Sequence, residues 1–541
     1  MTGSEAPQDA TPVLPGLNTG RAALAGMLAG ALALGVGELL AGISSSTPSL
    51  VVSVGELLVD VAPIKAVRVS IAIFATNDKP ALLIGIVVAT LVITGLLGVL
   101  ATSRRWIAVA GFALFGALGA WAGTRNPMAS DIAAVLVAVV AIGAGLGALF
   151  WLLGTLGTAE TAEAVSAREP ETAPPGTGHV MDRRGFVTAA VVVGVGAAAS
   201  AYLGRLLGAT SVVEAARSNL NLVATTETTV PTSVPAPVTF TAADYPGLSS
   251  LFTPNETFYR IDTALEVPQI DPATWRLRFT GMVDNPYELT FDELLAMPLV
   301  EQTITLSCVS NKVGGSLVGN AAWLGVPLTD LLDEAGVQPG ATQVVGRSVD
   351  DFTVGFPTAV LDGDRPALVA VGMNGEPLPA PHGFPARLVV SGLYGYVSAT
   401  KWLTEVELTT LDAFDAYWIP RGWAKEAPIK TQSRIDVPRT SRPLSPGTVP
   451  IAGIAWAPSR DIVRVEVQVD DRPWAEASLG ERVSEHAWRQ WVYLWDAEPG
   501  EHQLRVRATD GTGETQTEVV HAAPPDGATG WHTIEVNVSA S

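Results

Sequence analysis

The single cysteine of the chain, Cys308, stands where its neighbours could support chemistry. Residues 303–307 alternate like a β-strand, and a loop that contains Gly314 and Gly315 follows the cysteine. Lys312 lies in that loop, and a nearby cation favours the thiolate, which is both a nucleophile and a soft metal ligand. A lone cysteine can equally be a small buried hydrophobe. With one cysteine, these 541 residues can form no disulfide among themselves.

Several motifs around and beyond Cys308 occur in a characteristic order. They are residues 306–311 (LSCVSN), 323–328 (WLGVPL), 373–379 (MNGEPLP), 382–387 (HGFPAR) and 395–402 (GYVSATKW). In this order they resemble the cofactor region of the sulfite-oxidase family of molybdopterin-dependent oxidoreductases. The C-terminal portion is similar to the dimerisation domain of that family, through residues 433–436, 453–456 and 505–511. The resemblance extends roughly from Tyr245 to the C-terminus.

The resemblance implies a Mo-molybdopterin cofactor, in which a pterin dithiolene holds a single molybdenum. Cys308 would be the protein's metal ligand, and Arg260 would join it as a catalytic residue facing the substrate. The implied cofactor-binding residues are Tyr259, Asn311, Lys312, His382, Arg387, Ser398, Ala399, Thr400 and Lys401. The protein would position the metal and tune it, while the cofactor performs the redox step.

The chemistry of these side chains suits the implied roles, although each has a structural alternative. A pterin phosphate favours guanidinium and ammonium donors such as those of Arg387 and Lys401. Arg387 could instead form a salt bridge at a strand end, and Lys401 could be solvated. His382 could be a turn residue, and Asn311 could cap the loop after the cysteine.

The implied activity is oxygen-atom transfer between molybdenum and a small oxo-acceptor or oxo-donor substrate. Electrons would pass to or from a separate partner, either a cytochrome or a quinone-linked protein. Sulfite-type oxidation is the first expectation. Animal and plant sulfite oxidases, however, carry tyrosine just before the Met-Asn-Gly signature, whereas Val371 and Gly372 precede Met373 here. An S-oxide or N-oxide reductase is therefore the alternative within the enzyme class.

Two alternatives belong to other functional classes. One is a metal-free, membrane-anchored binding or adhesion protein, and retention of Cys308, His382 and Arg387 speaks against it. The other is a transporter or sensor, which is disfavoured because the apolar half has few charges and no evident repeat of broken helices.

The elements that must position these residues follow from periodicity. Residues 241–434 mix a strand at 275–279, a helix that begins after Thr290 with Glu293 at the capping-box position, and a buried strand at 387–390. An α+β domain of the sulfite-oxidase type is expected there. Residues 435–541 contain regular short alternating strands, which predict an immunoglobulin-like β-sandwich and leave a homodimer through it open.

The first 207 residues predict an α-helical membrane bundle of about five spans, because a bilayer core takes about 20 helical residues. The expected spans are 21–42, 80–101, 106–123, 131–154 and 186–207. Segment 48–76 is apolar but carries four charges, so it is read as amphipathic or re-entrant, with a further span left open. None of the spans contains histidine, so haem is not expected in them.

Arginines between the spans set the predicted orientation. Arg104 and Arg105 in one loop, and Arg168 in another, place these loops in the cytoplasm. Arg183 and Arg184 precede the last span and resemble a twin-arginine export signal, or simply a positive flank. The expected location is the cell membrane, multi-pass, with the catalytic domain on the extracytoplasmic side. The Thr/Pro-rich residues 208–240 read as a linker.

Composition agrees with a membrane part joined to a soluble part. Charged residues make up 16% of the chain, below the quarter that is usual for soluble proteins, and they are sparse before Gly208. The net charge of −20 argues against a nucleic-acid partner, because phosphate binding requires clustered Lys and Arg.

Overall fold

The computed structural model falls into two compact units, Met1–Ser211 and Val212–Ser541, and each is described by itself. It describes residues 19–44, 46–63, 73–74, 78–166, 183–209, 212–220, 222, 240–241, 243–363, 365–439 and 443–539. Most of the predicted linker 208–240, and Arg168 in the predicted cytoplasmic loop, lie outside the described residues.

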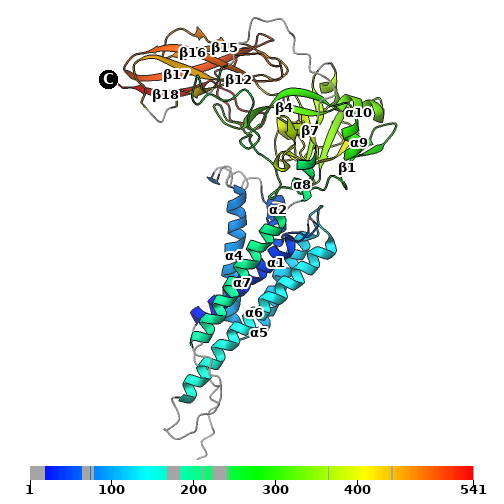
Figure 1. Cartoon of the computed structure of the whole chain (residues 1–541), viewed down its shortest axis with the longest axis vertical. Coiled ribbons are helices and arrows are strands. Elements are labelled where there is room, and N and C mark those ends of the chain that lie inside the picture. Colours follow the sequence, from blue (N-terminus) through cyan, green and yellow to red (C-terminus); the bar gives the residue numbers. More distant parts are fainter. Residues whose placement is uncertain are drawn as a thin grey trace, which may run out of the picture. The chain divides into compact units, whose positions relative to one another are not determined.

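The first unit consists of helices (Figure 1). Its helices are α1 (Thr19–Ala41), α2 (Leu50–Val61), α4 (Asp78–Ala101), α5 (Arg105–Gly123), α6 (Asp131–Ser166) and α7 (Arg183–Ala209). Among the described residues, five helices are long and apolar enough to cross a membrane: α1, α4, α5, α6 and the helix that contains Gly185. In the ambiguous segment 48–76, α2 has only 12 residues, too few to span a bilayer core.

Glycines allow the helices of this unit to approach each other closely. A Cβ added at Gly26 of α1 would collide with the Thr94 carbonyl of α4, and one at Gly98 of α4 would collide with the Ala22 carbonyl of α1. On the other side of α1, Gly35 lies against the Ala197 carbonyl of α7. Small residues at such contacts are typical of helices that associate within lipid.

Two sheets form the centre of the second unit, with strand orders β2-β1-β10-β5-β6 and β3-β4-β7-β8, where β9 also pairs with β7. The strands are β1 (Arg276–Gly281), β2 (Tyr287–Thr290), β3 (Val300–Ser307), β4 (Val318–Pro327), β5 (Gln343–Ser348), β6 (Thr353–Pro357), β7 (Ala367–Met373), β8 (Glu376–Pro377), β9 (Arg387–Val390) and β10 (Leu403–Thr409). β1 and β10 pair in parallel, and the remaining pairs are antiparallel.

Short helices join these strands around one hydrophobic core that includes Phe279, Trp323 and Phe356. They are α8 (Val212–Asn219), α9 (Phe291–Ala296), α10 (Leu328–Ala335), α11 (Gly395–Ser398) and the 3-10 turns η2 (Thr358–Leu361) and η3 (Ala380–His382). The predicted capping box of α9 is confirmed: the Thr290 hydroxyl accepts the Glu293 N–H, and the Glu293 carboxylate accepts the Thr290 N–H. The buried strand predicted at 387–390 is confirmed as β9.

Two four-stranded sheets follow, with orders β11-β12-β16-β15 and β14-β13-β17-β18. Their strands are β11 (Gln432–Val437), β12 (Gly447–Trp456), β13 (Ile462–Val469), β14 (Ala475–Glu476), β15 (Ser478–Leu479), β16 (Arg489–Ala497), β17 (Gly500–Asp510) and β18 (His532–Val538). Figure 1 shows them in orange and red towards the C-terminus. Both sheets contribute to a core of their own, in which Trp491 and Trp495 of one sheet accompany Val465 and Val506 of the other. The predicted domain boundary at 434/435 falls within β11.

Candidate active site

Cys308 directly follows β3, at the start of the loop that returns the chain to β4. The Cys308 N–H donates to the Leu317 carbonyl over 2.9 Å, and the Asn311 N–H donates to the Cys308 carbonyl over 3.0 Å. The Asn311 side-chain oxygen then accepts the Leu317 N–H. We call residues 308–317 the Cys308 loop. Asn311 therefore caps this loop through its side chain, which was the alternative to cofactor binding that the sequence analysis offered for this residue.

The Cys308 side chain is buried, with 9% of its surface exposed. Burial raises the pKa of the Cys308 thiol, while hydrogen bonds with Ser310 and the charge of Lys401 lower it. The sequence suggested Lys312 as the neighbouring cation, but Lys312 is exposed and the cation that acts on the thiol is Lys401. A thiol buried in this way becomes a thiolate when a metal ion replaces its proton.

Arg387, the first residue of β9, is a buried cation that lacks a counter-ion among the described residues. It is 4% exposed, and burial lowers its pKa to about 10. One of its terminal nitrogens donates to the His382 carbonyl over 3.0 Å, and its guanidinium lies 4.9 Å from the centre of the Trp323 ring. Its Nε has no hydrogen-bond partner there, and no described carboxylate lies within ion-pair distance. A buried charge without a partner costs several kcal/mol, so this geometry calls for an anionic ligand.

His382, at the end of η3, is kept neutral by its surroundings. Its Nε2 lies 2.9 Å from the Asn255 carbonyl, which can only accept, so this nitrogen carries the proton. The ring is 5% exposed and packs edge-on against Phe258. Burial, assisted by the charges of Arg387 and Lys401, lowers the pKa of His382 to about 4. His382 therefore offers a hydrogen-bonding imidazole and no charge near neutral pH.

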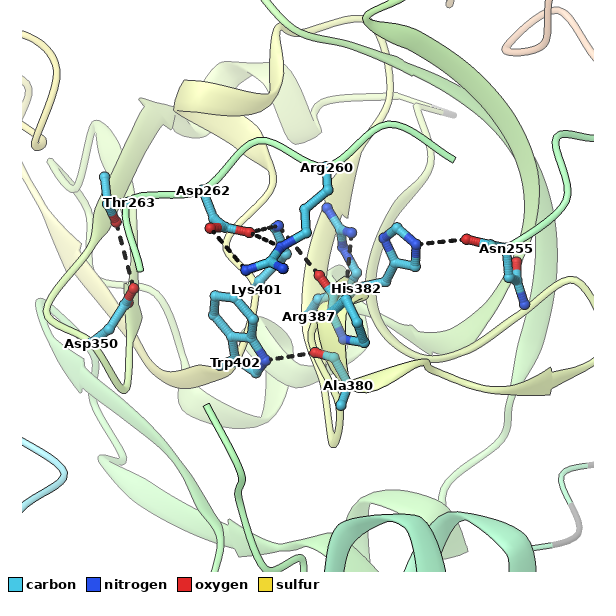
Figure 2. A network of polar contacts seen from close by, with 11 residues as sticks. Asn255, Arg260, Asp262, Thr263, Asp350, Ala380, His382, Arg387, Lys401 and Trp402 are labelled. Carbon is cyan, nitrogen blue, oxygen red and sulfur yellow. Dashed lines mark hydrogen bonds and ion pairs between the residues drawn. The ribbon is translucent and has the colours of Figure 1, made fainter. Parts of the chain in front are cut away.

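Arg260 and Lys401 meet at one carboxylate, that of Asp262 (Figure 2). The Lys401 Nζ and the Arg260 Nε both lie 2.7 Å from the same Asp262 oxygen. Lys401 is almost completely buried, and burial lowers its pKa to about 8 against the opposing effect of Asp262. We call Arg260, Lys401, Arg387 and Asp262 the cationic cluster. Two of its three positive groups, Arg260 and Lys401, pair with its one negative group, and Arg387 does not, so the cluster carries an excess of positive charge.

Tyr259 connects this cluster to the cysteine. A Cβ placed at Gly395 would lie 3.9 Å from both the Tyr259 hydroxyl and the Ser307 carbonyl, so the phenol and the end of β3 both border this glycine. The ring stacks on Phe258 with centroids 5.2 Å apart. Burial raises the pKa of Tyr259, the charge of Cys308 adds to the shift, and the charge of Arg387 opposes it.

Ser398, Ala399 and Thr400, which the resemblance implies to be cofactor-binding, are buried, and the hydroxyl groups of Ser398 and Thr400 are directed to backbone carbonyls. The Ser398 hydroxyl donates to the carbonyls of Leu393 and Tyr394, both over 3.1 Å. The Thr400 hydroxyl lies 3.4 Å from the Gly346 carbonyl. A hydroxyl that donates to a carbonyl cannot donate to a phosphate as well. Either hydroxyl would therefore have to turn away from its carbonyl before it could donate to a phosphate.

The structure thus brings together Cys308, Tyr259, Arg260, His382, Arg387 and Lys401, and leaves the Lys312 side chain at the surface. Sequence reasoning missed Asp262 and Asn255. Asp262 could have been found from its spacing, because residues i and i+2 of an extended segment point to the same side and place it beside Arg260. Asn255 carried no such signal, because its carbonyl is the atom that His382 binds.

Comparison with known proteins shows what the part of the chain that carries this site is similar to. Residues 264–418 match the family model "Oxidoreductase molybdopterin binding domain". The mitochondrial sulfite oxidase of Homo sapiens is 30% identical over 341 residues, covering 53% of this chain and 62% of the human protein. The sulfite oxidase of Arabidopsis thaliana is 27% identical over 336 residues, covering 51% of this chain and 84% of the plant protein.

A solved structure is also similar, the sulfane dehydrogenase SoxCD from Paracoccus pantotrophus, with a TM-score of 0.48 and 24% identity over 58% of this chain and 90% of that chain. The chain spans about 62% of the length of the mammalian sulfite oxidases it matches. The family match contains Cys308, His382, Arg387 and Lys401, and it begins just after Asp262. Residues 264–418 therefore form a molybdopterin-binding oxidoreductase domain, and this part of the chain is similar to sulfite oxidases.

Proposed function

We propose that the protein is a membrane-anchored, extracytoplasmic molybdenum-cofactor enzyme that performs oxygen-atom transfer on a small substrate. The observation that carries the proposal is Arg387, a buried guanidinium whose Nε lacks a partner among the described residues, within the same site as the buried thiol of Cys308. A cation and a thiol held in this way fit an anionic, metal-bearing ligand. The metal-free binding protein is less favoured, because it leaves this buried charge without a partner.

The residues present fit the molybdenum–pterin group. Cys308 would supply the protein's sulfur ligand to the metal, and Arg387 and His382 would hold the pterin. Lys401 and Arg260 would meet the anionic parts of cofactor and substrate. When bound, the group supplies two-electron oxygen-atom transfer, followed by one-electron exchange with a redox partner.

The chain's own residues prepare that chemistry. Trp323 lies beneath the Arg387 guanidinium and, being fully buried, excludes water from its face. Low local dielectric strengthens the interaction of such a cation with an anion. His382 holds its proton on Nε2 against Asn255 and leaves Nδ1 as an acceptor. Asn311 contributes by closing the Cys308 loop.

Sulfite-type oxidation is the proposed direction, supported by the relatives named sulfite oxidase. Reduction of an S-oxide or N-oxide is the second candidate, and one observation favours it. Val371, near the position where animal and plant sulfite oxidases carry tyrosine, is an apolar residue of β7 with 0% exposure. It therefore presents no phenol to a substrate. Steady-state assays in both directions, with artificial electron donors and acceptors, decide between the two.

The membrane location and the partners belong to the same proposal. The apolar helices anchor the chain, and the arginines at 104–105 and 183–184 orient it with the second unit outside. A cytochrome or a quinone-linked protein would exchange electrons with the site. The two C-terminal sheets, proposed to be immunoglobulin-like, would serve a homodimer.

The proposal is tested by metal and pterin analysis of the full-length protein, produced in a host that makes the pterin. We expect about one molybdenum and one pterin per chain for the wild type. Cys308→Ser should keep the thermal unfolding midpoint while turnover falls by at least about a hundredfold, because an oxygen ligand tunes the metal differently from sulfur. Arg278→Gln, which removes an exposed ion pair with Glu405 away from the site, is the control. Well-folded wild type without molybdenum or tungsten would refute the proposal.

A further inference from the structure

The Cys308 loop is held from outside as well as by its own hydrogen bonds. Two residues of the C-terminal sheets contact it, Arg434 of β11 and His532 of β18. Their contacts involve Gly314 and Gly315, in the middle of the loop. The loop that carries the proposed metal ligand is therefore packed against a different layer of the same unit.

Arg434 makes three contacts at once. Its Nη1 donates to the Gly315 carbonyl over 2.7 Å, and its Nη2 donates to the Ser249 hydroxyl over 2.8 Å. Its Nε lies 2.7 Å from a carboxylate oxygen of Asp436, and the other Asp436 oxygen accepts the Ser249 N–H. The orientation of the Arg434 guanidinium is therefore fixed, because all three nitrogens of this planar group make hydrogen bonds.

His532 restrains the neighbouring residue of the loop by packing. A Cβ at Gly314 would collide with the His532 imidazole, so only glycine fits there, and Gly314 also adopts a φ of 74°. The imidazole is itself held, because its Nδ1 accepts the Ile435 N–H over 2.9 Å. Next to it, a Cβ at Gly315 would collide with the Asn311 side-chain oxygen. At these two glycines the loop is therefore in close contact with His532 of β18 on one side and with the Asn311 side chain on the other.

We propose that Arg434 and His532 are positioning residues that fix the Cys308 sulfur through the Cys308 loop. That Cys308 is a metal ligand rests on the proposed function. The contacts of Arg434 and His532 with the Cys308 loop do not depend on that function. Arg434 acts on the backbone at Gly315 and His532 on the backbone at Gly314. Both restrain the segment that closes, through the Leu317 carbonyl, on the Cys308 N–H.

The single cysteine of the chain provides a site-specific probe. In cofactor-free, full-length protein, iodoacetamide alkylates Cys308 only when the loop opens, because the thiol is 9% exposed. Arg434→Gln should raise the alkylation rate roughly tenfold, because a hydrogen bond from a charged donor is lost. Arg472→Gln is the matched control, since Arg472 lies in the turn between the C-terminal strands β13 and β14 and pairs at the surface with Glu498 over 3.2 Å. An unchanged rate in folded Arg434→Gln overturns the role of Arg434.

The role of His532 is tested by substituting the loop residue that it contacts, Gly314. Gly314→Ala should raise the alkylation rate, and adding His532→Ala should reverse part of that increase by removing the ring with which the new methyl collides. Strictly additive effects of the two changes overturn the role of His532. This pair also keeps the proposal testable if Arg434→Gln does not fold.

Protein that contains molybdenum shows whether Arg434 positions the Cys308 sulfur or only stabilises the fold. At equal molybdenum content, Arg434→Gln should change the sulfur shell seen by molybdenum X-ray absorption, whereas Arg472→Gln should not. A shell identical to that of the wild type overturns the positioning role. If the folded wild-type protein contains no molybdenum, the proposed function is refuted. The alkylation rates of cofactor-free protein still decide whether Arg434 and His532 hold the loop.

Discussion

At the scale of single residues, the site is defined by charges that the protein alone does not neutralise. Arg387 is buried without a described counter-ion, and Lys401 and Arg260 share the carboxylate of Asp262. Each of these arrangements reduces the stability of the cofactor-free fold, because desolvated charge is unfavourable. The anionic cofactor proposed above would complete these arrangements by supplying the missing negative charge.

Replacement of Arg387 tests this explanation. In cofactor-free protein, Arg387→Met should leave stability unchanged or raise it by about 1–3 kcal/mol, because an uncompensated buried charge is replaced by an apolar side chain of similar length. The pterin content of protein made in a competent host should fall to near zero. Urea unfolding and pterin fluorescence measure the two effects. Arg278→Gln, at an exposed ion pair with Glu405, is the control, and a marked loss of stability in Arg387→Met would contradict the explanation.

Buried histidines predict a sensitivity to acid. Burial, with help from Arg365 and Arg482, lowers the pKa of His486 to about 4, below its usual 6.5. Between these values the unfolded chain binds more protons than the folded chain, so stability is complete above pH 6.5 and is lost as pH falls towards 4.

His486→Gln should flatten this dependence by up to about 1.4 kcal/mol per pH unit. The free energy of urea unfolding between pH 7 and 4, followed by tryptophan fluorescence, provides the measurement. His521→Gln, a change of an exposed histidine, should retain the wild-type slope. If the slope survives in His486→Gln as well, the assignment to this residue is wrong.

At the scale of elements, close backbone approach decides how α1 packs. Gly26 and Gly98 are not interchangeable with other glycines of the same helices, because carbonyls of the neighbouring helix occupy the space of a Cβ. Gly85 of α4, in contrast, has nothing within 4 Å of a Cβ position. Sequence periodicity cannot separate these cases, since both kinds of glycine lie in equally apolar helices.

A matched pair of substitutions checks this distinction. Gly26→Ala should destabilise the helical unit by about 1–3 kcal/mol through overpacking against Thr94. Gly85→Ala should be neutral or slightly stabilising, because alanine favours a helix by up to about 1 kcal/mol over glycine. Thermal unfolding in detergent compares them, and equal midpoints for the two variants would show that the close contact does not matter.

At the scale of the whole molecule, the proposed orientation makes the second unit extracytoplasmic. Arg183 and Arg184 open α7, at the position where a twin-arginine signal would act. Arg183→Lys with Arg184→Lys should leave the second unit inside the cytoplasm. Protease digestion of intact cells detects this, because the wild-type unit should be cleaved and that of the variant protected.

The control for that experiment is Arg104→Lys with Arg105→Lys, which changes a loop between two spans without touching the proposed signal. Positive charge is kept in both variants, so the positive-inside rule predicts no change from either. Normal accessibility of the second unit in the Arg183/Arg184 variant would show that the pair is an ordinary positive flank.

Much of the fold followed from local rules. The five apolar helices, the capping box at Thr290 and the buried strand at 387–390 are each determined within a few residues of sequence, by hydropathy, by one side-chain-to-backbone bond or by a continuous apolar run. The resemblance added Cys308, His382, Arg387 and Lys401, because their motifs have fixed order and spacing.

The sequence by itself therefore determined the apolar helices, the main strands and helices of the second unit, and, through the resemblance, the candidate residues of the site. Only the tertiary structure decided which cation acts on Cys308, that Asp262 joins Arg260 to Lys401, and that β11 and β18 hold the Cys308 loop. The physical reason is distance along the chain. Arg434 lies 119 residues beyond Gly315, and Lys401 lies 139 residues beyond Asp262, so only packing of the layers sets these contacts.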